Sequence, residues 1–285
     1  MTATRFTIKT DAGYYYNGFH DAAVVGNLMF QWGQHNSTLD TSQAFALHQS
    51  FGSRCYALLT SCSRQNVWSA LALASRGRSS FTVDRDGAID GNYPFYWLAI
   101  GDAPGTSIAA PHYATLGDSV ITWNDALSDY DGNQVFTTPT ALGGGTSAAV
   151  LTVTEANIRS ALGMASFDGP NRKLTLNRHN DVNGGIDFNY VAMGAKPGKT
   201  ATGVQQIGDL KLQWGRATTN SDYEQAFSFP EPFEDMNFAV ITALQGAGSR
   251  AIVSQTRPVN ARSFIVDRDA SIDGSYGFHW LAIGR

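Results

Sequence analysis

One phrase occurs twice in this chain and constrains its fold more than any other feature. Residues 81–101 read FTVDRDGAIDGNYPFYWLAIG and residues 264–284 read FIVDRDASIDGSYGFHWLAIG, with fifteen of 21 positions identical and no gap. A more divergent copy, LTLNRHNDVNGGIDFNYVAMG, occupies residues 174–194. Internal repetition of this kind indicates a fold built from copies of one structural unit.

Matching segments upstream of the phrase predict where each copy begins. GNLMFQWG, GDSVITWN and GDLKLQWG place Trp32, Trp123 and Trp214 at equal spacings of 91 residues. Pro/Gly/Thr-rich segments separate the copies, as linkers do. The expected divisions are an N-terminal docking segment at 1–22, repeat 1 at 23–102, a divergent repeat 2 at 112–195 and repeat 3 at 204–285.

The apolar pattern within a copy has a period of two, which is typical of β-strands. We predict an all-β protein of three tandem small antiparallel β-sandwich modules, with six short strands in each. In the closing strand, one face carries Tyr93, Phe95 and Trp97, and the other carries Tyr96, Leu98 and Ile100. Because both faces are apolar, one should meet the second sheet of its own module and the other a neighbouring module. This favours an intrachain pseudo-trimer about a pseudo-three-fold axis, with a string of separate modules as the alternative.

The divergent copy contains TEANIRSALGMASF at residues 154–167, where the other copies have a strand pattern. The spacing of Ile158, Leu162 and Met164 predicts a short helix, which Glu155 or Asn157 would cap.

Two cysteines, Cys55 and Cys62, lie seven positions apart in CYALLTSC. In an extended strand their Cα atoms would be roughly 23 Å apart. A disulfide requires a separation below about 7 Å. We therefore expect thiols that are mostly buried.

Composition excludes several classes of partner. The formal net charge is −4 and no block of Lys or Arg occurs, so neither nucleic acid nor an anionic membrane surface is expected to bind. No apolar run is long enough to insert into a membrane, and the N-terminal sequence has no signal-peptide pattern.

Carboxylates recur in the turn of the repeated phrase. Asp86 and Asp90 in the first copy correspond to Asp269 and Asp273 in the third. Closely spaced carboxylates can build a calcium site, but an Arg lies inside this turn and the distal Glu of a recognised loop is missing. Three interpretations remain: a hydrogen-bonded structural turn, a ligand-binding site and a calcium site. We predict no metal site.

No motif for catalysis is present. The sequence lacks a G-x-S-x-G elbow and a phosphate loop, and its six histidines show no metal-ligand spacing. We therefore expect a protein that is not an enzyme, with no catalytic residues and no cofactor.

Aromatic side chains provide candidate contacts. The segment DAGYYYNGFHDA contains Tyr14, Tyr15, Tyr16, Phe19 and His20, which could dock on another protein, pack on the first module or contact a ligand. Trp68, with core burial as its alternative, and His279 are further candidate ligand contacts.

The repeated motifs resemble those of the carboxy-terminal tip domain of bacteriophage tail-fibre proteins. The resemblance rests on QWG near the start of a module, FP-x-PF in its second strand and the closing F-x-W-L-A-I-G. In module 3 these residues are Trp214, Gly215, Phe229, Pro230, Phe278, Trp280, Ala282 and Gly284. The resemblance implies a lectin-like β-sandwich, similar to H-type lectins, that forms trimers at a fibre tip and binds host glycans or proteins.

The expected function is therefore that of a receptor-binding protein on a phage or phage-like virion. Its partners would be a host-surface carbohydrate or protein, and other virion proteins reached through residues 1–22. It would be made in the host cytoplasm without a signal peptide and would act on the virion, in a tail fibre or spike. Two alternatives remain: a structural virion component that uses the fold as a scaffold, and a depolymerase.

Overall fold

The computed structural model describes residues 3–10, 18–38, 41–63, 71–85, 92–107, 112–129, 132–154, 162–178, 184–220, 224–246, 254–268 and 274–285. In these ranges every helix or strand element is a strand, which confirms the all-β fold class. Alternating apolar residues and many β-branched side chains account for this, because such a pattern fits a pleated surface that is buried on at least one face.

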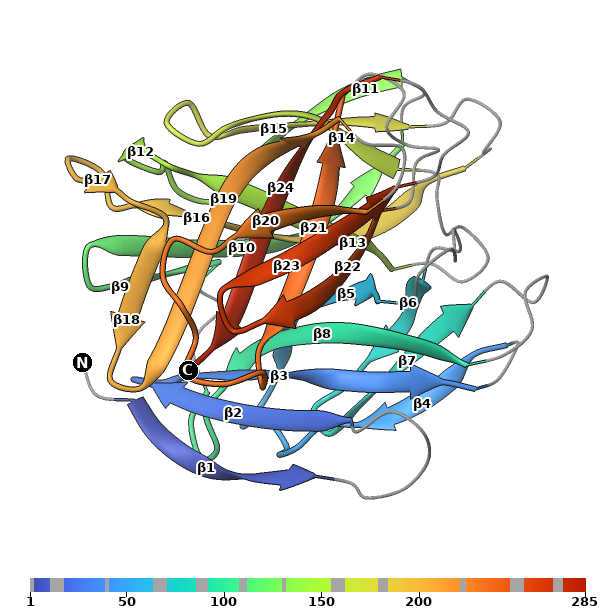
Figure 1. Ribbon diagram of the computed structural model, residues 1–285, viewed down its shortest axis with the longest axis vertical. Coiled ribbons are helices and arrows are strands. Elements are labelled where there is room, and N and C mark those ends of the chain that lie inside the picture. The colour runs from blue at the N-terminus through green and yellow to red at the C-terminus, as the bar shows by residue number, and fades with distance from the viewer. Residues whose placement is uncertain are drawn as a thin grey trace.

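The strands follow one another along the chain as three groups, which we call units 1, 2 and 3 (Figure 1). Unit 1 contains β2 (Phe19–Val25), β3 (Leu28–Ser37), β4 (Gln43–Ala46), β5 (Cys55–Cys62), β6 (Leu71–Arg76), β7 (Ser80–Arg85) and β8 (Tyr93–Asp102). Unit 2 contains β9 (Tyr113–Leu116), β10 (Ser119–Ser128), β11 (Gly132–Thr137), β13 (Ala148–Val153), β14 (Leu162–Asp168), β15 (Lys173–Arg178) and β16 (Ile186–Ala195). Unit 3 contains β18 (Val204–Ile207), β19 (Leu210–Thr219), β20 (Gln225–Ser228), β21 (Ala239–Gln245), β22 (Ser254–Asn260), β23 (Ser263–Arg268) and β24 (Tyr276–Gly284). Outside these sets, β1 (Ala3–Thr10) pairs with β2, and β12 (Gly144–Gly145) pairs with β17 (Thr200–Ala201).

The same strand orders recur in each unit. One group of strands in each unit has the order β2-β3-β8-β5, β9-β10-β16-β13 or β18-β19-β24-β21, and a second group has the order β4-β7-β6, β11-β15-β14 or β20-β23-β22. The groups β11-β15-β14 and β18-β19-β24-β21 belong to one seven-stranded sheet. Each set of described strands therefore has seven members, one more than the six predicted. The opening strands β9 and β18 have only four residues each, too few for an alternating pattern to identify. In the described part of the chain, a parallel bridge between Met164 and Gln245 joins β14 of unit 2 to β21 of unit 3.

A glycine-led turn begins the long second strand of every unit. Gly26, Gly117 and Gly208 have φ values of 61°, 63° and 62°. Each is the first residue of a two-residue hairpin loop, for example between Val25 and Leu28. A turn of this kind needs positive φ at its first central position, which glycine adopts without a steric penalty.

The closing strand of unit 1 is buried along its whole length, as its two apolar faces predict. Tyr93, Phe95 and Trp97 belong to the core of unit 1. Tyr96, Leu98 and Ile100 belong to a different cluster that also contains residues of the other units. Both predicted faces of this strand are therefore confirmed.

Among the described residues, the buried apolar side chains form one core within each unit and one core shared by the three units. The shared core includes Trp32 of unit 1, Trp123 of unit 2 and Trp214 of unit 3, all at most 1% exposed. Around it, the equivalent strands β5, β13 and β21 each contact the other two. Full burial of a large apolar side chain contributes about 1.5–3 kcal/mol, so this core is a main source of cohesion between units.

A glycine in β3 and another in β19 make room for the tryptophan of the closing strand. Gly33 lies opposite Trp97 and Gly215 opposite Trp280 in the antiparallel pairs. A Cβ added at Gly215 would lie 2.8 Å from atoms of the Trp280 ring. The indole covers the glycine, a device that stabilises glycine-containing strand pairs.

Two local predictions have different outcomes. The helix predicted within residues 154–167 is wrong for its described C-terminal part, because Leu162 and Met164 lie in strand β14, paired with β15. Pairing with β15 and burial of both side chains in the core of unit 2 override the helical spacing. Residues 155–161 lie outside the described residues. The cysteine prediction is confirmed: Cys55 and Cys62 form no disulfide, and they lie at the two ends of β5.

Candidate functional site

Most of the predicted contact residues lie outside the described residues, and their roles stay predictions. These are the ligand candidates Trp68, Asp86, Asp90, Asp269 and Asp273, and the docking candidates Tyr14, Tyr15 and Tyr16. The remaining three candidates, Phe19, His20 and His279, are described.

Phe19 and His20 belong to strand β2, which crosses the expected boundary between residues 22 and 23. Phe19 is buried in the shared core, with its ring 6.4 Å from that of Tyr96. The His20 ring lies 5.4 Å from His35 and 5.7 Å from His48, between centroids. The sequence left three alternatives for this segment: docking on another protein, packing on the first module and contact with a ligand. Phe19 packs within the protein, because its buried ring is not accessible to another protein.

His279 lies at the contact between units 2 and 3 and not on a ligand-accessible surface. It is fully buried, its Nδ1 accepts the backbone N–H of Ala149 at 3.0 Å, and its Nε2 lies 2.9 Å from Oε1 of Gln245. Burial, together with the nearby charge of Arg216, lowers the pKa of His279 to about 3. The ring is therefore neutral, and its role is to hold unit 3 against strand β13 of unit 2.

The repeated tryptophans mark where one unit meets the next. Nε1 of Trp214 in unit 3 donates to the carbonyl of Thr146 in unit 2 at 2.9 Å. Nε1 of Trp32 in unit 1 donates to the carbonyl of Asn237 in unit 3 at 3.0 Å. Trp123 of unit 2 stacks on Tyr56 of unit 1, with ring centroids 5.7 Å apart. Each unit thus inserts its tryptophan against a different neighbour.

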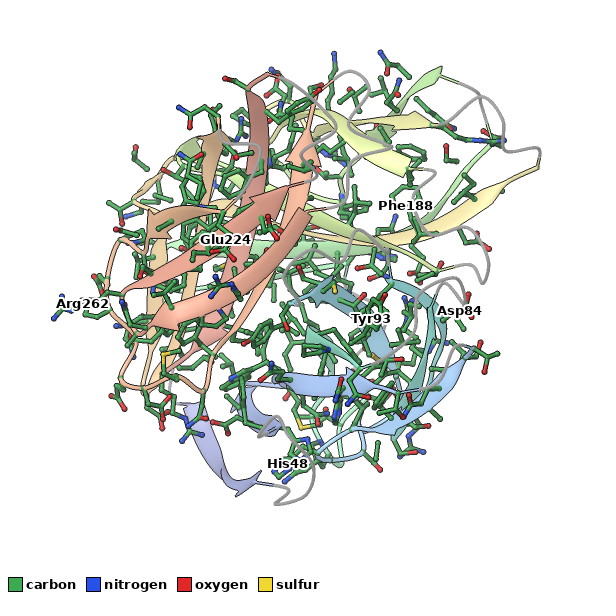
Figure 2. All side chains as sticks on the ribbon, turned by 45° about the vertical axis from the view of Figure 1, so that its right-hand side comes forward. His48, Asp84, Tyr93, Phe188, Glu224 and Arg262 are labelled. Carbon is green, nitrogen blue, oxygen red and sulfur yellow. The ribbon has the colours of Figure 1, made fainter. Side chains whose placement is uncertain are left out.

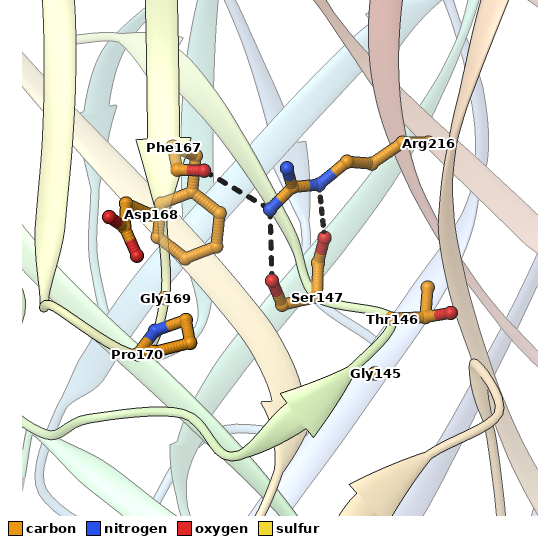
Figure 3. Close-up of a pocket in the computed structure, with 8 residues that line it drawn as sticks. All are labelled: Gly145, Thr146, Ser147, Phe167, Asp168, Gly169, Pro170 and Arg216. Carbon is orange, nitrogen blue, oxygen red and sulfur yellow. Dashed lines mark hydrogen bonds between the residues drawn. The ribbon is translucent and has the colours of Figure 1, made fainter.

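A cleft of about 580 Å³ lies beside the contact between units 2 and 3 (Figure 3). Its lining consists of Gly145, Thr146, Ser147, Phe167, Asp168, Gly169 and Pro170 of unit 2 and Arg216 of unit 3. The Arg216 guanidinium donates through Nε to the Ser147 carbonyl at 2.6 Å, and through Nη2 to Ser147 Oγ at 2.9 Å and the Phe167 carbonyl at 3.1 Å. It also lies over the Phe167 ring, 5.6 Å from the centroid.

The carboxylate of this cleft is also engaged by the protein. The side-chain amide of Asn171 donates to one carboxylate oxygen of Asp168, and the backbone N–H of Asn171 donates to the other. These hydrogen bonds, the side-chain one most, hold the pKa of Asp168 below its usual value. Arg216 and Asp168 carry opposite charges, so the charged lining of this cleft is balanced. The cleft can offer hydrogen bonds to a hydroxylated ligand without favouring an anion or a cation.

A second cleft, of about 320 Å³, occupies the equivalent place between units 1 and 2. Ala57 and Ala148 pair with the same position of their closing strands, so Cys55 and Thr146, each two residues earlier, are equivalent. Asp125 and Arg216 are equivalent because they lie at the same position of the strand that pairs with the closing strand. The lining comprises Ser53, Arg54, Cys55, Tyr56, Arg76, Gly77 and Arg78 of unit 1, and His112, Trp123, Asn124 and Asp125. Arg76 forms an ion pair with Asp125 across the contact. These two residues also line a neighbouring hollow of about 380 Å³.

The clefts contain polar residues that sequence reasoning did not identify as candidates. Arg216 lies two residues after the repeated tryptophan of unit 3, and the same position holds Gln34 in unit 1 and Asp125 in unit 2. A repeat that keeps its tryptophan and changes the charge two residues later indicates a contact of variable chemistry. That comparison could have identified Arg216 and Asp125 from the sequence.

The structure suggests neither a metal site nor a membrane span in the ranges that it describes. Within them, no three side chains of His, Cys, Asp or Glu come together in a way that could bind a metal ion. These ranges also contain no helix of the length and hydropathy that crossing a bilayer would require.

The C-terminal part of the chain is similar to a known protein family. Residues 208–285 match the family model described as putative tail fiber protein gp53-like, C-terminal. No curated protein and no solved structure matches the chain. The matched residues span β19 to β24, and they include all the motif residues of module 3 from Trp214 to Gly284. The resemblance to a phage tail-fibre C-terminal domain is therefore confirmed for this part of unit 3.

Proposed function

We propose that this chain is a phage or phage-like virion protein that attaches the particle to a bacterial surface glycan or protein. The observation that carries the proposal is the match of residues 208–285 to a tail-fibre C-terminal domain. Tail fibres are virion components, and attachment to the host is the function that the predicted receptor-binding tip would perform. We expect no catalysis, no cofactor and no nucleic-acid partner.

We further propose that the chain is a covalent counterpart of a trimeric fibre tip, with three modules packed as a pseudo-trimer. The recurring strand orders, the mutual contacts of β5, β13 and β21, and the shared core support this arrangement. A tip with three similar faces can present several weak sites to a repetitive surface, and multivalency then raises the overall affinity without deep pockets.

Attachment to the rest of the virion would use the N-terminal segment. Strand β1 forms the outer edge of the five-stranded sheet of unit 1, next to β2 (Figure 1). An edge strand offers unpaired backbone donors and acceptors to another chain, a common mode of protein docking. This feature also favours the second candidate function, a structural virion subunit that uses the fold only as scaffold.

Cell binding tests the proposal directly. Fluorescently labelled protein is incubated with a panel of bacterial strains, before and after enzymatic or chemical removal of surface glycans. The proposal expects saturable binding to a restricted set of strains, with loss of binding on stripped cells if the receptor is a glycan and on protease-treated cells if it is a protein. Binding to virion proteins with none to any strain would support the structural alternative. Steady release of sugar fragments from capsule would instead indicate a depolymerase.

A further inference from the structure

The contact between units 1 and 2 leaves a buried donor without a partner. Trp123 is 1% exposed, and its Nε1 has no hydrogen-bond partner among the described residues. The equivalent indoles of Trp32 and Trp214 each donate to a backbone carbonyl of the neighbouring unit. Here the equivalent carbonyl, that of Cys55, accepts Nε of Arg76 at 3.2 Å instead. Most buried N–H groups in proteins have a partner, so this donor is available to an acceptor that enters the cleft beside it.

The cleft that Trp123 lines is rich in arginine. Its lining contains three arginines, Arg54, Arg76 and Arg78, but one carboxylate, that of Asp125, which already forms an ion pair with Arg76. Arg54 and Arg78 are exposed, and Nε of Arg78 is fixed by the carbonyl of Phe51 at 3.2 Å. The lining is therefore cationic, whereas the equivalent cleft between units 2 and 3 has one cation and one anion.

We propose that this cleft, lined by Arg54, Arg78 and Trp123, binds an oxyanion carried by a saccharide. Guanidinium groups recognise carboxylate and phosphate through charge-assisted hydrogen bonds, and an anchored arginine loses less freedom on binding. The indole N–H of Trp123 is a further donor that an oxyanion, directly or through a water, would satisfy. The inference rests on the proposed function in one respect: the saccharide would belong to an acidic surface polysaccharide of the host.

Nuclear magnetic resonance of the full chain provides the test. The protein, labelled with ¹⁵N, is titrated at physiological salt with glucuronate, glucose 1-phosphate and, as a neutral control, glucose. The inference expects the Trp123 indole resonance, assigned with Trp123→Phe, to shift with at least one of the two anions and not with glucose. The Trp214 indole resonance should stay in place. A response to glucuronate alone assigns a carboxylate, a response to glucose 1-phosphate alone a phosphate, and a response to both an oxyanion of either kind.

Variants link the response to the two exposed arginines. The double substitution Arg54→Gln with Arg78→Gln should weaken anion binding at least tenfold, while the fold is retained as judged by the remaining resonances. Arg262→Gln is the matched control, since Arg262 is exposed at the outer edge of unit 3 (Figure 2). The inference is overturned if no anion shifts the Trp123 resonance, if glucose shifts it equally, or if the double variant binds anions as the wild type does.

The outcome is separable from that of the proposed function. Cell binding by a protein that shows no anion response would overturn the inference and leave the proposed function intact. An anion response in a protein that binds no cell would support the site and count against host attachment.

Discussion

The contact between units 2 and 3 and the contact between units 1 and 2 place different residues at equivalent positions. His279 and Asn189 occupy the same place in the closing strand, and each accepts a backbone N–H of the preceding unit, that of Ala149 or Leu58. The pairs that bridge the clefts differ as well. Arg216 reaches backbone carbonyls of unit 2, whereas Asp125 forms an ion pair with Arg76 of unit 1.

The difference shows how units with the same strand orders can still meet in one fixed arrangement. The apolar residues of the shared core are similar in every unit, so they cannot by themselves select which surfaces meet. Polar contacts that suit one neighbour and leave unpaired groups against another supply such selection. The contact between units 3 and 1 has its own pair, a buried ion pair between Arg285 and Asp21 at 2.7 Å.

Protonation of His279 should produce the largest effect. The unfolded side chain titrates near 6.5, whereas burial lowers its pKa in the folded protein to about 3. Between these values the unfolded state binds more protons, so stability rises with pH and is lost as pH falls below 6.5. The expected loss is about 2–3 kcal/mol between pH 7 and pH 4.5. Chemical denaturation at a series of pH values measures it.

The control uses the residue that unit 2 carries at the same place. His279→Asn keeps an acceptor for the N–H of Ala149, as Asn189 does for Leu58, and has no titrating group. The variant should lose this part of the pH dependence. An equal fall in stability in wild type and variant as pH is lowered would refute the assignment.

Substitution of Gly215 by alanine should have the second largest effect. The added methyl group would lie 2.8 Å from the Trp280 ring, and overpacking of this kind costs about 1–3 kcal/mol. Unit 2 has Asn124 opposite Tyr190 in the corresponding pair, so Asn124→Ala should cost less than 1 kcal/mol, roughly the range for partly exposed sites. Urea denaturation of both variants gives the comparison, which fails if the two substitutions destabilise equally.

The indole hydrogen bond distinguishes the two contacts on a smaller scale. Trp214→Phe and Trp123→Phe remove the same atoms, but only the first breaks a hydrogen bond and leaves the carbonyl of Thr146 without its indole donor. We expect Trp214→Phe to be more destabilising by about 1–2 kcal/mol. Thermal and urea unfolding would show this difference. Equal destabilisation would mean that the indole of Trp123 is satisfied as well.

The strands were predictable from sequence because their pattern is local. Alternation placed Tyr93 and Tyr96 on opposite faces, and the structure places them in different cores. The helix predicted around Met164 failed because antiparallel pairing with β15, the next strand along the chain, and burial in the core of unit 2 override the helical spacing of the apolar residues. The glycine-led turn at Gly26, Gly117 and Gly208 is a local signal that predicts the short opening strands once it is recognised.

The candidate clefts were less predictable, because they form only where units meet. Nothing local to Arg216 or Arg76 shows that one reaches the carbonyl of Ser147 and the other the carboxylate of Asp125. His279 occupies the position of Tyr96 in the closing strand, on the face expected to meet a neighbouring module, but its sequence context does not show that the ring accepts the N–H of Ala149. Contacts between copies need the spatial arrangement of the copies, which a period-two pattern does not contain.

Substitutions of Asp125 and Arg216, which bridge the two clefts, should have the smallest effects on stability. The salt dependence of these effects should differ most clearly between the two contacts. Asp125 is 58% exposed on its side chain, so Asp125→Asn should cost less than about 1 kcal/mol, and this cost should shrink in 1 M NaCl because salt screens an exposed ion pair. Arg216→Lys keeps the charge but cannot reproduce the fork that reaches Ser147 and Phe167, so it should cost about 1 kcal/mol, largely independent of salt. Denaturation of both variants at low and high salt measures these costs. If salt reduced both costs alike, Arg216 would act through its charge as Asp125 does, and the two contacts would differ in sign of charge alone and not in the kind of interaction.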